Sequence, residues 1–156
     1  MKALVVYDSA FGNTEKVAQA MGEALGAEAL RPGDVKPEHL KGLDLLIVGS
    51  PTQKFTALPS INGFLKGLSN SGLDGVKVAA FDTRFPQSQV DEVGILAFFA
   101  RLFGYAAEPI GKRLEKKGGH LVVAPEPFFV SDTEGPLLDG ELDRAANWAR
   151  QVAAAM

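Results

Sequence analysis

Short apolar runs alternate along the chain with amphipathic segments, and the two patterns predict strands and helices in turn. A nearly continuous apolar run indicates a strand that is covered on both faces. The predicted strands are residues 3–7, 27–30, 43–49 and 75–82, and a fifth that begins at 120–124 and continues past two prolines to 128–130. Apolar residues at four-residue spacing, as in Val17, Met21 and Leu25, instead indicate an amphipathic helix.

Further helices are predicted at residues 59–68, 107–117 and 138–152, with a single helical turn at 37–40. Regular alternation of strand and helix implies a parallel sheet with right-handed crossovers. Five strands at this spacing fit the order 2-1-3-4-5, in which a ligand lies beyond the carboxyl ends of the first and third strands. The expected fold class is therefore α/β, and 156 residues is the length of one domain, residues 1–156.

The composition excludes several classes of function. The chain has no cysteine, which rules out disulfides, thiol catalysis and cysteine-based metal sites. A formal net charge of −3 argues against nucleic acid as a partner, since such proteins carry a basic patch or stripe. No transmembrane segment is expected, and the first residues enter a strand without a signal-peptide layout, so a cytoplasmic location is expected.

The first predicted strand is followed by a loop rich in hydrogen-bond donors. Ser9, Asn13 and Thr14 supply side-chain donors, and Gly12 lets the backbone approach a ligand closely. A helix begins here, and the first amides of a helix have no internal partner and carry partial positive charge. The loop lacks the lysine of a nucleotide P-loop. Neutral donors at a helix start suit one dianionic monophosphate, and the alternative is an ordinary turn with a helix cap.

Two more polar loops follow the third and fourth predicted strands, and the strand order places them beside the first loop. They begin at Ser50 and Asp82. We expect them to hold a planar, partly apolar ring that carries several hydrogen-bond acceptors. Backbone amides of residues 52–54 would donate to this ring, and Phe85 or Phe55 would stack on it. Taken singly, each of these loops is equally well explained as a surface connection.

The first loop resembles the phosphate loop of the flavodoxin family, which commonly reads Ser/Thr-x-Thr/x-Gly-Asn-Thr; Ala10 is a departure here. The resemblance extends over essentially the whole chain. It implies a three-layer α/β/α sandwich with a five-stranded parallel sheet, and a non-covalently bound FMN that carries one or two electrons. The FMN-binding residues predicted from this resemblance and from the ring loops are Ser9, Ala10, Phe11, Gly12, Asn13, Thr14, Pro51, Thr52, Gln53, Lys54, Asp82, Thr83, Arg84 and Phe85.

The sequence departs from the flavodoxin pattern around the ring. Family members usually sandwich the ring between a Trp and a Tyr, whereas the only tryptophan here, Trp148, falls in the last helix, where a packing role is expected. No glycine lies between Ser50 and Asn62, where many members use one for a peptide flip, so the neutral one-electron-reduced flavin should be stabilised weakly. Lys54 and Arg84 would raise the flavin potential, bind the phosphate of a nicotinamide donor, or point into water.

Two functions fit this resemblance. The first is an electron carrier, in which the flavin does the chemistry and the protein sets its potential for redox partner proteins. The second is an NAD(P)H-dependent FMN quinone reductase, because residues 49–52 are similar to members that reduce quinones. The carrier is preferred because the chain has the short, single-domain layout of a flavodoxin. A flavin-binding sensor or interaction module is a third, weaker class.

An apolar stretch at residues 93–105 separates the fourth strand from the next helix. It contains Phe98 and Phe99, is interrupted by Arg101, and is too short to span a bilayer. The preferred interpretation is the buried start of a helix, and the alternative is an apolar docking face, dimer face or lid over the flavin. Residues 132–136 are expected to form the turn before the last helix, with the rim of the site as the alternative.

Overall fold

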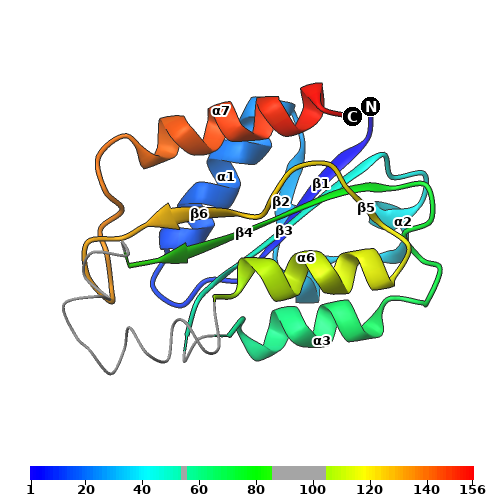
Figure 1. Ribbon diagram of the computed structural model, residues 1–156, viewed down its shortest axis with the longest axis horizontal. Helices are drawn as coiled ribbons and strands as arrows, with labels where there is room; N and C mark the ends of the chain where they lie inside the picture. Colours follow the sequence, from blue (N-terminus) through cyan, green and yellow to red (C-terminus); the bar gives the residue numbers. More distant parts are fainter. Residues whose placement is uncertain (54–55, 86–104) are drawn as a thin grey trace.

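A computed structural model of the protein describes residues 1–53, 56–85 and 105–156. Within these residues, strands and helices alternate along the chain (Figure 1). The strands are β1 (Ala3–Tyr7), β2 (Glu28–Leu30), β3 (Leu45–Pro51), β4 (Lys77–Arg84), β5 (His120–Leu121) and β6 (Glu126–Phe129). The helices are α1 (Asn13–Leu25), α2 (Pro37–Leu40), α3 (Pro59–Gly67), α6 (Ala107–Lys116) and α7 (Glu141–Ala154), with a 3-10 turn η1 at Pro32–Asp34.

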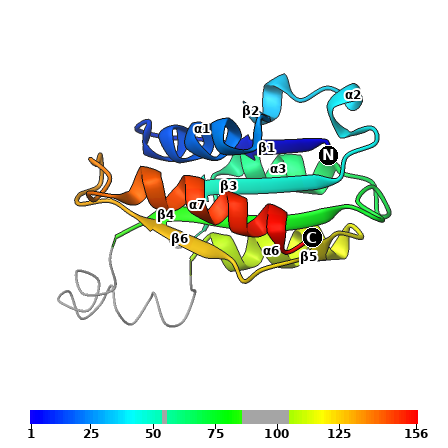
Figure 2. The same ribbon diagram turned by 90° about the horizontal axis from the view of Figure 1, so that it is seen from above.

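The strands form one parallel sheet in the order β2-β1-β3-β4-β5, which confirms the predicted topology. Helices α1 and α7 cover one face of the sheet, and α3 and α6 cover the other (Figures 1 and 2). Val5 and Ile47 belong to the apolar cluster under α1 and α7, whereas Val6 and Val48 belong to the cluster under α3 and α6. The fold is therefore the expected three-layer α/β/α sandwich. Among the helices described, none has the length and apolar character needed to cross a membrane.

The predicted fifth strand forms as two separate pieces. β5 pairs with the first two residues of β4, and β6 pairs with its last four residues, both in parallel register. Pro125 lies between the two pieces and Pro127 lies within β6. Proline has no amide hydrogen to donate to a neighbouring strand, which accounts for the interruption. β6 consequently runs beside the end of β4 and leads the chain to the carboxyl edge of the sheet.

β3 and β4 continue beyond their predicted ends, to Pro51 and Arg84. β3 pairs with β4 as far as Pro51 and Thr83, and β6 pairs with the other side of β4 as far as Arg84. Because the neighbouring strands extend the ladder, the predictions of loops that begin at Ser50 and Asp82 are wrong. Successive side chains of a strand point to opposite faces of the sheet. The side chains of Asp82 and Thr83 therefore point to opposite faces of the sheet.

The close approach of β3 to β4 depends on Gly49, which is the direct partner of Phe81 across the two strands. A Cβ atom on residue 49 would lie 2.1 Å from Cζ of the Phe81 ring. The Phe81 side chain is fully buried, and its ring makes edge contacts with Phe128 and Trp148. The ring therefore covers the backbone of residue 49 and has no free space to move into. Trp148 packs in the core, as the sequence predicts.

We expect Gly49→Ala to lower the free energy of unfolding by about 1–3 kcal/mol, because the added methyl group forces neighbouring side chains or backbone to move. Urea unfolding followed by circular dichroism measures this change. Gly63→Ala is the matched control, because a Cβ atom at residue 63 meets nothing within 4 Å and alanine favours the helix. An unchanged stability of Gly49→Ala would contradict the packing described here.

Candidate functional site

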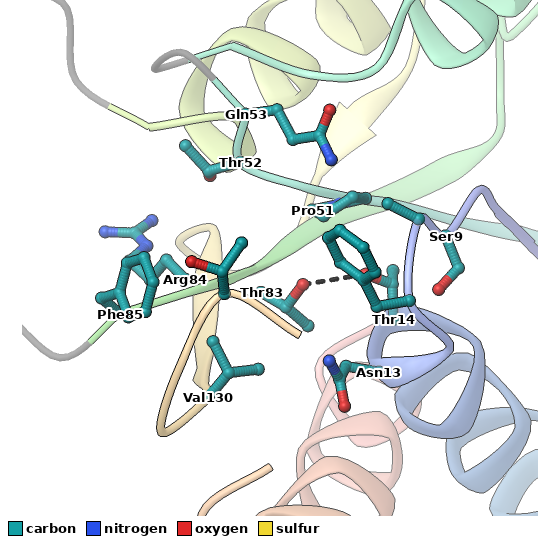
Figure 3. A pocket seen from close by; sticks show the side chains of 13 residues that line it. Ser9, Asn13, Thr14, Pro51, Thr52, Gln53, Thr83, Arg84, Phe85 and Val130 are labelled. Carbon is teal, nitrogen blue, oxygen red and sulfur yellow. Dashed lines mark hydrogen bonds between the residues drawn. The ribbon is translucent and has the colours of Figure 1, made fainter. Parts of the chain in front are cut away.

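The carboxyl ends of β1, β3 and β4 meet at one edge of the sheet, where a pocket with a cavity volume of about 80 Å³ opens (Figure 3). The described residues that line the pocket are Ser9, Ala10, Phe11, Asn13, Thr14, Pro51, Thr52, Gln53, Thr83, Arg84, Phe85, Val130 and Thr133. The three segments predicted from the sequence therefore surround one cavity.

Helix α1 begins at this pocket without a capping side chain. Its N-cap residue is Gly12, with a φ of 91°, and no described side chain caps the first turn. Glycine adopts this left-handed conformation readily, whereas another residue there would be strained. The Gly12 amide donates to Ser9 Oγ over 3.0 Å, which folds the loop back on itself. The first-turn amides of α1 are thus left for a ligand.

Two side chains of α1 join this end of the pocket to neighbouring segments. The hydroxyls of Thr14 and Thr83 lie 2.8 Å apart and share a hydrogen bond (Figure 3). Asn13 Nδ2 donates to the Glu134 carbonyl over 3.1 Å. Both Thr14 and Asn13 are buried. The start of α1 is therefore fixed to β4 on one side and to the segment before α7 on the other.

Backbone hydrogen bonds hold the segment that follows β3. The Thr52 amide donates to the Thr83 carbonyl over 3.0 Å, and the Gln53 amide donates to the Thr56 carbonyl over 2.9 Å. Both amides are therefore satisfied within the protein, which corrects the prediction that they donate to a ring. The cause is local pairing, because Gln53 and Thr56 form an antiparallel bridge. The remaining amide of that prediction belongs to Lys54, which lies outside the described residues.

Asp82 does not line the pocket. Its carboxylate is fully buried and accepts hydrogen bonds from Arg84 Nε at 2.8 Å, from Arg84 Nη2 at 2.7 Å and from the Ala107 amide at 2.9 Å. Burial raises the pKa of Asp82, and the bonds from Arg84 and Ala107 oppose that rise. The Arg84 guanidinium also stacks on the Tyr105 ring at 3.7 Å. Asp82 therefore anchors Arg84 and the start of α6.

The structure brings most of the predicted FMN-binding residues together around the pocket. Asp82 and Gly12 are the exceptions among the described residues, and Gly12 instead shapes the loop. Lys54 and Phe55, the alternative stacking residue, lie outside the described residues. Residues 93–104 of the apolar stretch lie outside them as well, so their role stays a prediction.

Val130 lines the pocket but was not predicted as a site residue, whereas Thr133 lines it in agreement with the alternative that residues 132–136 reach the rim of the site. Both follow β6, whose pairing with the last residues of β4 places them at the ligand edge. The sequence did carry a signal, since the predicted fifth strand ends at residue 130 beside the fourth. A strand that ends there sends the next residues over the same edge of a parallel sheet.

The pocket is lined mainly by neutral groups. Arg84 carries the only formal charge among the described lining residues. No group of three His, Asp or Glu side chains in residues 1–53, 56–85 and 105–156 is arranged to hold a metal ion. This end of the sheet therefore suits an organic ligand that is bound by neutral donors and apolar contacts.

Comparisons with known proteins agree with this geometry. The family model named Flavodoxin matches residues 5–151. A flavodoxin from the domain Archaea has 23% sequence identity and a TM-score of 0.74, and the match covers 99% of this chain and 97% of that chain. Oxidised flavodoxin 1 from Bacillus cereus has 16% identity and a TM-score of 0.74, with 100% and 99% covered. A flavodoxin, WrbA-like protein from Agrobacterium tumefaciens has 19% identity and a TM-score of 0.71, with 98% and 96% covered.

The structural likenesses confirm the sandwich fold, and the family match spans nearly the whole chain. The chain therefore belongs to the flavodoxin family, and it binds FMN and carries electrons through that non-covalently bound flavin.

Proposed function

We propose that FMN occupies the pocket with its phosphate against residues 9–14 and its ring between the ends of β3 and β4, and that redox partner proteins exchange electrons with it there. One observation carries this assignment: the start of α1 is uncapped and faces the pocket. Uncapped helix amides carry partial positive charge and bind phosphate.

The phosphate end of the pocket offers donors without a formal charge. Ser9 Oγ accepts from the Gly12 amide, so its own proton is free to donate to a ligand. Ala10 is exposed and leaves room at the mouth of the loop. Neutral donors and a helix start are sufficient for one monophosphate, whereas a triphosphate would call for cations.

The opposite end of the pocket offers apolar surface for a flat ring. Phe85 and Arg84 lie together at the end of the pocket away from Ser9 (Figure 3). Pro51 and Val130 line the space between, and the Phe11 side chain, 50% exposed, adds an aromatic surface at the mouth. Apolar walls with a few polar groups are typical of cofactor sites. When bound, FMN supplies one- or two-electron transfer, and these residues would orient it and exclude water.

Arg84 is placed to influence the flavin potential. It lines the pocket, yet its guanidinium is held by the buried carboxylate of Asp82 and by the Tyr105 ring. A fixed cation beside the ring favours the more negative, reduced state of the flavin. The Asp82 carboxylate on the far side of the guanidinium reduces that effect. A modest upward shift of the potential is therefore the expected role of Arg84.

The cytoplasmic location and the identity of the partner stay predictions. A protein partner is favoured by the exposed Phe11 ring at the mouth of the pocket, since aromatic side chains are common at docking surfaces. A quinone-like acceptor is the second candidate, because residues 49–52 are similar to family members that reduce quinones.

We expect Ala10→Asp to weaken FMN binding about tenfold to a hundredfold, because a carboxylate beside the phosphate repels the dianion. Riboflavin, which lacks the phosphate, should lose much less affinity. Quenching of flavin fluorescence by the apoprotein measures both dissociation constants. Gln151→Glu is the control, since it adds the same charge at an exposed position near the end of α7. Equal losses of affinity for FMN and riboflavin would show that the phosphate does not bind at this loop.

We expect Arg84→Gln to lower the flavin reduction potential by about 30–60 mV, the equivalent of ~1.4 kcal/mol for a two- or one-electron couple. The substitution removes a cation from beside the ring, and burial drives Asp82, left without its arginine, towards its neutral form. Redox titration of the FMN-loaded protein measures the shift. An unchanged potential in this variant would refute this role.

A carrier is expected to need a partner before NADPH can reduce it. We expect anaerobic NADPH alone to leave the visible absorbance of the FMN-loaded protein unchanged over minutes, and a flavodoxin reductase added afterwards to bleach it. Stopped-flow absorbance follows both steps. Rapid bleaching by NADPH alone would support the NAD(P)H-dependent quinone reductase instead.

A further inference from the structure

Two carboxylates flank the loop that is assigned to the phosphate. Asp8 lies immediately before the loop, and Glu15 lies in the first turn of α1. Arg31, which follows β2, forms ion pairs with both: Nη1 contacts the Asp8 carboxylate, and Nη2 lies 3.0 Å from Glu15 Oε2. One guanidinium thus bridges the two ends of the loop.

Further hydrogen bonds fix these carboxylates in place. Asp8 accepts from the Ser9 amide at 2.8 Å and from the Ser60 hydroxyl. Tyr7 donates to Glu15 Oε2 at 3.1 Å, and Arg31 lies over the Tyr7 ring at 5.3 Å from its centroid. Burial acts to raise the pKa of Asp8, but the bonds from Ser60 and Ser9 and the Arg31 charge hold it below its usual value. Asp8 is therefore ionised at neutral pH.

A dianionic phosphate in this loop would have two like charges nearby, both of them beside the Arg31 guanidinium. The loop is six residues long, so both carboxylates lie close enough to the phosphate to act within about one Debye length. Each carboxylate alone repels the phosphate. Arg31 brings the net charge of the Asp8, Glu15 and Arg31 group from −2 to −1, and it does so without lining the pocket.

We propose that Arg31 is a positioning residue that sets the preference of this protein for phosphorylated over unphosphorylated flavin. It neutralises part of the flanking acidic charge and joins the two ends of the loop, so that the helix start can accept the dianion. This inference rests on the proposed function, because it takes residues 9–14 as the phosphate site. The preferred ligand in this proposal is a flavin monophosphate, and the compound that binds less tightly is riboflavin.

A role in stability alone predicts a different behaviour. The side chains of Arg31, Asp8 and Glu15 are 40%, 22% and 36% exposed. Partly exposed ion pairs add little to stability, because water and salt screen them. If Arg31 served only to hold the fold together, its removal would change the affinities for FMN and riboflavin by the same factor.

The test compares the dissociation constants of FMN and riboflavin for the apoprotein at low salt. We expect Arg31→Gln to reduce the preference for FMN about tenfold, because the phosphate then faces an uncompensated pair of carboxylates, while riboflavin affinity stays within about twofold. The double variant Glu15→Gln/Arg31→Gln restores the local net charge and should recover most of the preference. Arg150→Gln is the matched control, since Arg150 is an exposed arginine near the end of α7 that contacts Asn147.

An unchanged FMN preference in Arg31→Gln, or no recovery in the double variant, would overturn the proposal. If Arg31→Gln does not fold, Glu15→Gln alone tests the proposal. This variant should raise the preference for FMN several-fold, and an unchanged preference would equally overturn the proposal. A wild-type protein with no preference for FMN over riboflavin would instead refute the proposed phosphate site itself. Failure of the inference and failure of the proposed function are thus separate outcomes.

Discussion

The parallel register of β1, β3 and β4 is the constraint on which the rest of the site depends. Val6 pairs with Val48, and Val48 with Ala80, so the three strands deliver their following residues to one edge of the sheet. Residues that are 69 positions apart, such as Thr14 and Thr83, can then touch. In an open parallel sheet, ligands bind in the crevice beyond the carboxyl ends of the strands.

Two arginines at this edge of the sheet are held in ion pairs with carboxylates. Arg84 is balanced by a buried carboxylate beneath the ring end, and Arg31 is shared between two carboxylates beside the phosphate end. The pocket itself is left with the partial charge of a helix start and with neutral hydroxyls. In the binding mode that we propose, directed donors recognise the phosphate, and the neighbouring ion pairs set how much opposing charge it encounters.

The sheet order and the position of the first loop at the pocket could be predicted from the sequence, because apolar runs mark the strands and a donor-rich loop precedes the first helix. The direction of the Asp82 side chain could not be predicted from the sequence, since it depends on where β4 ends and hence on the length of β6 beside it. The same pairing brings Val130 to the pocket. The Thr52 amide was assigned to a ligand because nothing in the sequence reveals its bond to the neighbouring strand.

The contact between Thr14 and Thr83 has a consequence for how many protons the pocket can offer. A hydroxyl has one hydrogen to give, and each of these two oxygens is the other's partner at 2.8 Å. One hydroxyl therefore donates its hydrogen to the other. Only the second hydroxyl has an O–H left to donate to a bound ligand. The direction of that bond decides whether helix α1 or strand β4 delivers it, so rotation of two hydroxyls is enough to exchange donor and acceptor between the two halves of the site.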